Sequence, residues 1–248
     1  MLALTLVLIG FGSWLSRYHT AEWNRPLWVV VFPINGDASA VTRAYIDTLT
    51  RASFAPIEQY LAKQAQGYGV AQSTPMEIRL GPQLSDQPPE PPYGGSVLRI
   101  VAWSLHLRWW AWHATSAYDG PPIDVRLFIV YHDPALSPQL AHSLGLKEGM
   151  IGVANVFATR GMAGSNDVVV AHELLHTVGA TDKYDPVTNL PHYPDGYAEP
   201  EREPRYPQTR AELMAGRLPI SATQAEIPRS LAKTLIGPAT AREIGWRE

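Results

Sequence analysis

The sequence predicts an α/β protein in which helices cover one mixed, twisted β-sheet. Apolar runs of strand length alternate with longer segments of helical character: strands are expected at residues 27–33, 76–80, 124–131 and 149–159, and helices at 41–66, 97–117 and 166–178. Strands that alternate with helices favour a single sheet packed between helices. Of the 248 residues 46% are hydrophobic, which is enough for one domain with a full core.

The strand predictions rest on continuous apolar runs. Residues 27–33 (LWVVVFP) and 124–131 (DVRLFIVY) are typical of buried strands. Residues 149–159 (GMIGVANVFAT) contain two glycines, which weaken a strand interior and are typical of places where another backbone approaches closely. We therefore expect residues 149–159 to form an edge strand.

Two helices are predicted before the last strand. The first, residues 41–66, is interrupted near Pro56 and closed by Gly67. The second, residues 97–117, contains four tryptophans and only two charged side chains, Arg99 and Arg108. We expect its aromatic side chains to pack on the sheet, because tryptophan is mostly buried in folded proteins. An exposed surface for a partner or a membrane is the alternative.

The third helix, residues 166–178, is expected to be capped by Asn166 or Ser165. Beyond Gly179 the composition shifts to Pro, Tyr, Asp and Glu, with helical character returning only at 210–214 and 231–246. The chain is therefore expected to divide into an N-terminal subdomain, residues 27–180, and a small irregular C-terminal subdomain, residues 181–248.

Charge and cysteine content exclude several classes of function. The formal net charge is −3 and no Lys/Arg run occurs, which argues against a nucleic-acid partner. The chain has no cysteine, so disulfides and thiolate metal sites are excluded. Residues 1–16 are apolar and uncharged, and we expect a signal anchor or export signal that tethers the protein in the cell envelope. A buried N-terminal element is the alternative.

One motif carries chemistry: His172-Glu173-Leu174-Leu175-His176. A spacing of four on a helix places both imidazoles on one face, where both can bind one ion. Glu173 lies beside the first histidine and can take a proton from a water that zinc activates. Two ligands and a general base within five residues predict a catalytic zinc site.

Catalytic zinc usually has three protein ligands. Gly179 can adopt a left-handed conformation that ends the helix and turns the chain back, which would return the Asp182 carboxylate to the same ion. Other carboxylates remain as alternatives for the third ligand: Asp185, Glu199, Glu201 and Glu203. A structural calcium ion bound by Asp182, Asp185, Asp195 and Glu199 is less favoured than a solvated loop, because the regular alternation of a calcium loop is missing.

The pattern His172-Glu173-x-x-His176-x-x-Gly179-x-x-Asp182 resembles the extended zinc signature of the metzincin metallopeptidases, in the variant with Asp as third ligand. The resemblance implies a zincin-like fold, an antiparallel edge strand that binds extended substrate, and a methionine-containing turn beneath the metal, for which Met214 is the candidate. Some members keep a tyrosine two residues after that methionine. Here none follows Met214, and the available tyrosines are Tyr184, Tyr193, Tyr197 and Tyr206.

The residues and the resemblance together predict a zinc-dependent metalloendopeptidase that acts on peptide or protein substrates. His172, His176 and Asp182 are expected to hold one Zn²⁺ ion, with Glu173 as general base. The alternative is a catalytically inactive zinc-binding domain that recognises peptides or regulates a partner.

Overall fold

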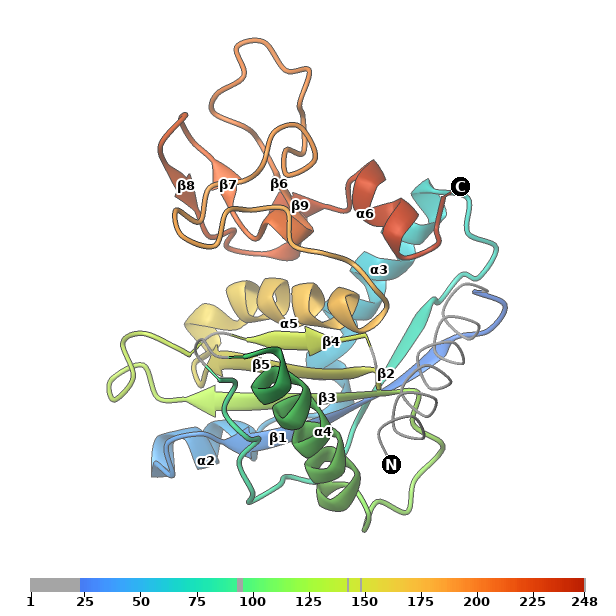
Figure 1. Ribbon diagram of the computed structural model, residues 1–248, viewed down its shortest axis with the longest axis vertical. Helices are drawn as coiled ribbons and strands as arrows, with labels where there is room; N and C mark the ends of the chain where they lie inside the picture. Colours follow the sequence, from blue (N-terminus) through green and yellow to red (C-terminus); the bar gives the residue numbers. More distant parts are fainter. Residues whose placement is uncertain (1–22, 93–95, 142, 148, 248) are drawn as a thin grey trace.

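The computed structural model describes residues 23–92, 96–141, 143–147 and 149–247. It confirms the α/β class: a five-stranded mixed sheet has the order β2-β1-β3-β5-β4, with helices on both faces (Figure 1). The parallel strands are β1 (Leu27–Asn35), β2 (Met76–Leu80), β3 (Val125–His132) and β5 (Ile151–Phe157), and β4 (Leu144–Leu146) runs antiparallel to β5.

The edge strand is β4, so the expectation that residues 149–159 form the edge is wrong. β5 pairs with β3 on one side and with β4 on the other. Its glycines have a different cause. A Cβ on Gly152 would lie 2.7 Å from Leu127 Cδ1, and Gly149 has φ +109°, a conformation that glycine adopts without strain. Strand β4 has only three residues, too few for an apolar pattern that would reveal a strand in the sequence.

Successive side chains of the central strands point to opposite faces and build two cores. On one face Val29, Val31 and Leu127 pack with α3 (Ala55–Gly67) and α5 (Ala163–Thr177). On the other face Val30 and Phe128 pack with α4 (Val97–Ala114). The connection between β1 and α3 contains α2 (Ala40–Ile46) and the 3₁₀ turn η1 (Arg51–Phe54), and a further 3₁₀ turn, η2 (Arg160–Met162), precedes α5.

Helix α4 differs from its prediction in burial. Leu107, Trp110 and Ala111 are buried against the sheet as expected, but Trp109 and Trp112 are exposed. Only one side of the helix contacts the protein within the described residues. The scarcity of charge along residues 97–117 predicted burial on most sides, and that prediction is wrong.

The C-terminal segment contains short elements above α5 (Figure 1). These are β6 (Ala211–Glu212), η3 (Leu213–Ala215), β7 (Leu218–Pro219), β8 (Ala225–Glu226), η4 (Leu231–Lys233), β9 (Thr234–Leu235) and α6 (Pro238–Glu243). The expected helix at 210–214 is wrong: β6 pairs with β9, and the Glu212 carboxylate accepts a hydrogen bond from Ala215 N to form a tight turn. Of residues 231–246, only α6 is α-helical.

The predicted anchor at residues 1–16 lies outside the described residues. Among the helices in the described ranges, none combines the length and apolar character needed to cross a membrane.

Candidate metal centre

Helix α5 carries the HExxH residues across one face of the sheet. It begins at Ala163, earlier than predicted, and neither Ser165 nor Asn166 caps it. The Asn166 side chain instead donates to Phe157 O at 2.8 Å and accepts from Phe157 N at 3.2 Å, which ties the helix to the end of β5. His172 and Glu173 are buried on this helix.

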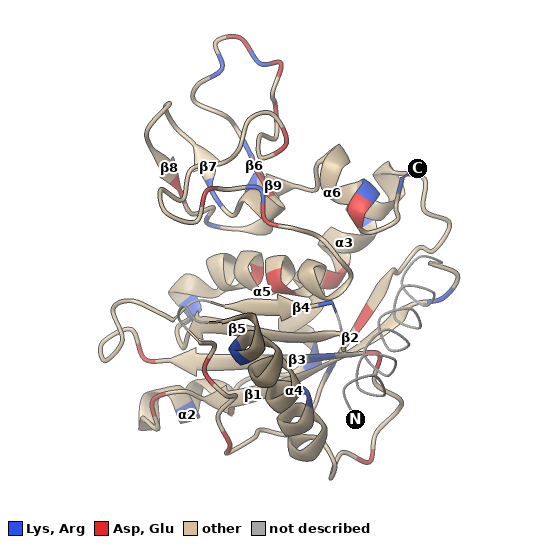
Figure 2. Ribbon diagram, in the orientation of Figure 1, with Lys and Arg blue, Asp and Glu red and all other residues tan. Residues whose placement is uncertain are grey.

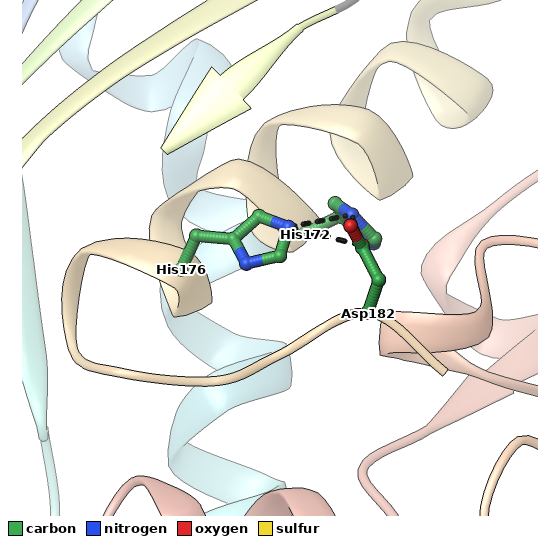
Figure 3. A group of neighbouring side chains, drawn as sticks. All are labelled: His172, His176 and Asp182. Atoms are coloured by element: carbon green, nitrogen blue, oxygen red, sulfur yellow. Dashed lines mark hydrogen bonds and ion pairs between the residues drawn. The ribbon is translucent and has the colours of Figure 1, made fainter. Parts of the chain in front are cut away.

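The three predicted ligands come together at one point (Figure 3). His172 Nε2 and His176 Nε2 are 3.1 Å apart, and Asp182 Oδ1 lies 3.1 Å from the first and 3.2 Å from the second. Neighbouring ligand atoms around a tetrahedral zinc with bonds of about 2.0–2.1 Å are about 3.3–3.4 Å apart. The near-equilateral triangle of donor atoms is therefore compatible with zinc.

The turn that brings Asp182 back is the one predicted at Gly179, which has φ +109°. Ala180 N donates to Leu175 O and Gly179 N donates to His176 O, the hydrogen-bond pattern of a Schellman motif. A Cβ at Gly179 would also lie 2.4 Å from Lys147 Nζ. The backbone conformation thus favours glycine here, whereas the flexible Lys147 side chain could move aside.

Two backbone carbonyls orient the imidazoles. His172 Nδ1 lies 3.0 Å from Leu213 O, and His176 Nδ1 lies 2.8 Å from Ala180 O. In a neutral ring, an Nδ1–H that donates to a carbonyl leaves Nε2 with its lone pair free for a metal. Both free nitrogens face Asp182. The sequence did not reveal these carbonyls, because Leu213 is 41 residues from its histidine and any residue type offers a carbonyl.

The candidate methionine lies in the turn that supplies one of these carbonyls. Met214 is fully buried in η3, between Leu213 and Ala215, and Gly216 ends the turn with φ +66°. Lys183 N donates to Met214 O at 3.0 Å, so the turn also contacts the residue after Asp182. The structure therefore places Met214 directly against the metal-ligand segment.

The carboxyl group of Glu173 is buried beside the ligand triangle. One of its oxygens, Oε2, has no hydrogen-bond partner among the described residues. Burial raises the pKa of this carboxyl, and the neighbouring His172 and His176 oppose that effect. A buried carboxyl with a free oxygen and a raised pKa has the properties of a general base.

Electrostatics hold the triangle together without a metal. Burial alone would lower the pKa of His172, but the hydrogen bond to Asp182 and the charge of Glu173 raise it to about 9. Burial of Asp182 acts to raise its pKa, yet hydrogen bonds from both histidines bring it well below its usual range. A divalent cation at this position would compete with the proton that the raised pKa of His172 favours.

Among the four tyrosines considered, Tyr184 is the one beside the site. Its ring centroid lies 6.4 Å from that of His172. Burial, together with the charges of Asp182 and Glu173, raises the pKa of its phenol, so the hydroxyl stays protonated at neutral pH. The other three contact each other or Arg205: Tyr197 and Tyr206 share a hydrogen bond of 2.8 Å, and Tyr193 packs on Arg205 and Tyr197.

The competing carboxylates point elsewhere. Asp185 Oδ1 accepts hydrogen bonds from Val187 N and Thr188 N in an exposed turn, and Glu199 accepts from Thr209. Glu201 and Glu203 line a separate surface depression with Tyr206. None of these four belongs to the His172–His176–Asp182 group.

A buried ion pair fixes the loop that carries Asp182. Lys183 Nζ lies 2.8 Å from both oxygens of Glu243 in α6, and the same carboxylate accepts from Thr181 N and Thr181 Oγ1. Glu243 thereby holds the residues on either side of Asp182.

The edge strand lies against the site helix. A Cβ on Gly145 of β4 would be 2.4 Å from His176 Cβ and 2.6 Å from Glu173 O. Only glycine permits this approach. Within the described residues, no strand pairs with the outer edge of β4.

Comparison of the chain with models of known protein families found no match, and comparison with curated proteins also found none.

Proposed function

We propose that this protein is a zinc-dependent peptidase. The observation that carries the proposal is the convergence of three ligand atoms of suitable type within 3.2 Å of one another, beside a buried carboxyl with a free oxygen. Two imidazole nitrogens, one carboxylate oxygen and an adjacent general base form the set that hydrolytic zinc sites use.

In this proposal His172 Nε2, His176 Nε2 and Asp182 Oδ1 hold the ion. When bound, zinc supplies a Lewis acid that polarises the substrate carbonyl and makes a neighbouring water more acidic. The backbone carbonyls of Leu213 and Ala180 keep both histidines in the tautomer that a metal requires.

Glu173 moves the proton. Its Oε2 takes a proton from the attacking water as the water oxygen bonds to the carbonyl carbon of the substrate. The same oxygen then gives that proton to the amine nitrogen as the C–N bond breaks, and a carboxylic acid and an amine leave. Because burial raises the pKa of Glu173, its protonated form is accessible between these two steps.

Tyr184 is proposed to stabilise the transition state. Its protonated hydroxyl would donate a hydrogen bond to the carbonyl oxygen as that oxygen gains negative charge. The outer edge of β4 is proposed to bind an extended peptide through backbone hydrogen bonds, as exposed sheet edges do in other peptide-binding proteins.

The test combines metal analysis with hydrolysis of an unfolded, fluorescently quenched protein substrate. Zinc should bind with a stoichiometry of one, and Asp182→Ala should lower that occupancy. Glu173→Gln should keep the ion and lower kcat by at least about 100-fold. Tyr184→Phe should lower kcat with little change in metal content. A Glu173→Gln variant as active as the wild type would refute the mechanism.

The alternative function, a zinc-binding domain without catalysis, makes a different prediction for the same assays. It predicts stoichiometric zinc and peptide binding but no hydrolysis by the wild type. The free Glu173 oxygen favours the peptidase, since a purely structural site has no use for a buried carboxyl beside its ligands.

A further inference from the structure

Helix α4 presents a continuous apolar stripe to solvent. Its members follow one another at intervals of three or four residues, so they lie along one side of the helix. They are Leu98, Val101, Leu105, Trp109 and Trp112, with exposed fractions of 79%, 40%, 41%, 58% and 63%. Val97, also exposed, flanks the stripe at its N-terminal end, whereas the exposed Ile100 lies on the side of the helix that carries Leu107.

The opposite side of α4 is also apolar, because Leu107, Trp110 and Ala111 pack on the sheet. A helix that is apolar on two opposite sides normally has non-aqueous neighbours on both. Exposed apolar patches of this extent mark surfaces that bind protein or membrane. The stripe therefore requires a partner that removes it from water.

Charge indicates the chemistry of that partner. No Asp or Glu occurs between Glu90 and Asp119, whereas the chain as a whole has a net charge of −3. Figure 2 shows α4 without acidic residues, and its only charged side chains are Arg99, which is exposed, and Arg108, which is half-buried. Two histidines stack beside the exposed indole, His106 at 6.1 Å and His113 at 5.4 Å from the ring centroid of Trp109. The surface is thus apolar, aromatic and weakly basic.

We propose that the α4 stripe lies in the interface of a lipid bilayer that contains anionic headgroups. Tryptophan prefers the boundary between headgroups and acyl chains, and arginine binds lipid phosphates. Leu98, Val101 and Leu105 enter the apolar layer below the headgroups, as the apolar face of an interfacial helix does.

The N-terminal sequence supports a lipid partner over a second protein. Residues 1–15 carry no charged side chain and are mostly apolar, so the sequence offers a second apolar segment that suits a bilayer. Membrane binding strengthens with the apolar area that enters the lipid, so α4 would add to the attachment that the N-terminal run supplies. Because α5 packs on the opposite face of the sheet, a membrane-bound α4 would leave the candidate metal centre facing away from the lipid (Figure 1).

The natural absence of cysteine gives a direct test in the full chain. Leu105→Cys, with Leu98→Cys as a second probe, is labelled with an environment-sensitive fluorophore. Val187→Cys, at a position 87% exposed and outside α4, is the control. Each protein is mixed with phosphatidylcholine vesicles, with or without phosphatidylglycerol, that carry a lipid-attached quencher.

The proposal predicts quenching at positions 98 and 105, stronger with phosphatidylglycerol, and none at 187. When Trp109→Ser and Trp112→Ser are introduced into the labelled variants, the ratio of membrane-inserted to free protein should fall by about 10-fold or more, because two large apolar side chains are lost.

Three results would overturn it. A probe at 105 that is shielded before lipid is added, and unchanged afterwards, would mean that residues 1–22 cover the stripe. Shielding that depends on protein concentration would indicate a second copy. Vesicle binding without quenching at 98 or 105 would leave the N-terminal segment as the only anchor. Since no outcome depends on hydrolysis, failure here is independent of the peptidase proposal.

Discussion

Replacing Glu243 by Ala should weaken both the fold and the candidate metal site, because this carboxylate, from the distant helix α6, holds the loop that carries Asp182. Lys183 is only 7% exposed, and Glu243 is its partner at 2.8 Å. Removing one member of a buried ion pair typically costs about 3–5 kcal/mol. The Glu243 side chain is 30% exposed, so water can partly solvate the Lys183 ammonium once the carboxylate is removed. We therefore expect a loss at or just below the lower limit of that range, about 2–3 kcal/mol in the free energy of unfolding.

The effect on zinc has a different origin. Glu243 accepts hydrogen bonds from Thr181 N and Thr181 Oγ1, and Thr181 directly precedes Asp182. Thr181 is exposed, so water satisfies its N–H when Glu243 is removed, and the loop gains freedom. Loss of a residue that orients a ligand typically lowers metal affinity about 10- to 100-fold.

A paired variant separates the two effects. Lys183→Met combined with Glu243→Leu replaces the ion pair by apolar side chains of similar size, which is often neutral for stability. Urea unfolding in the presence of a chelator, followed by tryptophan fluorescence, should show most of the stability regained. Competition with a chromophoric chelator should still show zinc affinity about 10-fold below wild type, because Thr181 has lost its acceptor Glu243 and the hydrogen bonds that Lys183 Nζ donates to Thr181 O and Oγ1. Equal zinc affinity in wild type and both variants would refute the positioning role of Glu243.

Three further predictions concern the same region. Gly145→Ala should destabilise the protein by about 1–3 kcal/mol in urea unfolding, because the added Cβ would lie 2.4 Å from His176 Cβ. The control is Gly161→Ala, whose added Cβ meets nothing nearer than 4.0 Å. Burial raises the pKa of Asp167 to about 6. Ionisation of this carboxyl therefore destabilises the fold as pH rises from about 4 through 6. Replacement of Asp167 by Asn should accordingly raise Tm more at pH 7 than at pH 4.5. Without metal, the raised pKa of His172, about 9, stabilises the fold fully below about pH 6.5 and progressively less up to pH 9. With a chelator present, the midpoint of urea unfolding should therefore fall as pH rises from about 6.5 to 9. The increase in midpoint on addition of zinc should grow over the same range, because zinc binds the deprotonated imidazole.

The ligand triangle was predictable because it is local. His172, His176 and Asp182 lie within eleven residues, and two rules of backbone geometry place them: the spacing of four along a helix and the left-handed turn at Gly179. No contact between distant segments is needed to bring the three together. The same reasoning gave the central strands, whose apolar runs are set by burial on both faces.

The groups that orient the triangle were not predictable, since they come from far along the chain. Leu213 contributes a backbone carbonyl, and since every residue type has one, the sequence does not reveal this contact. Glu243 lies 60 residues after Lys183 and reads as an ordinary surface carboxylate of a short helix. The glycines of residues 149–159 were associated with the close approach of another backbone at a sheet edge, but Gly152 packs against the Leu127 side chain and Gly149 has a positive φ. Neither cause distinguishes an inner strand from an edge strand in the sequence.

Helix α4 shows why composition alone cannot decide burial. Few charges and four tryptophans indicate that residues 97–117 require non-aqueous neighbours, and that inference stands whether the neighbour is the sheet, another protein or lipid. The sheet accounts for only one side, at Leu107 and Trp110. The exposed stripe from Leu98 to Trp112 is as apolar and aromatic as the buried side of the helix. Only the arrangement of the other elements reveals that this stripe lacks a non-aqueous neighbour among the described residues. The exposed apolar stripe and the absence of acidic side chains along the helix are the physical basis for proposing that α4 binds a lipid surface.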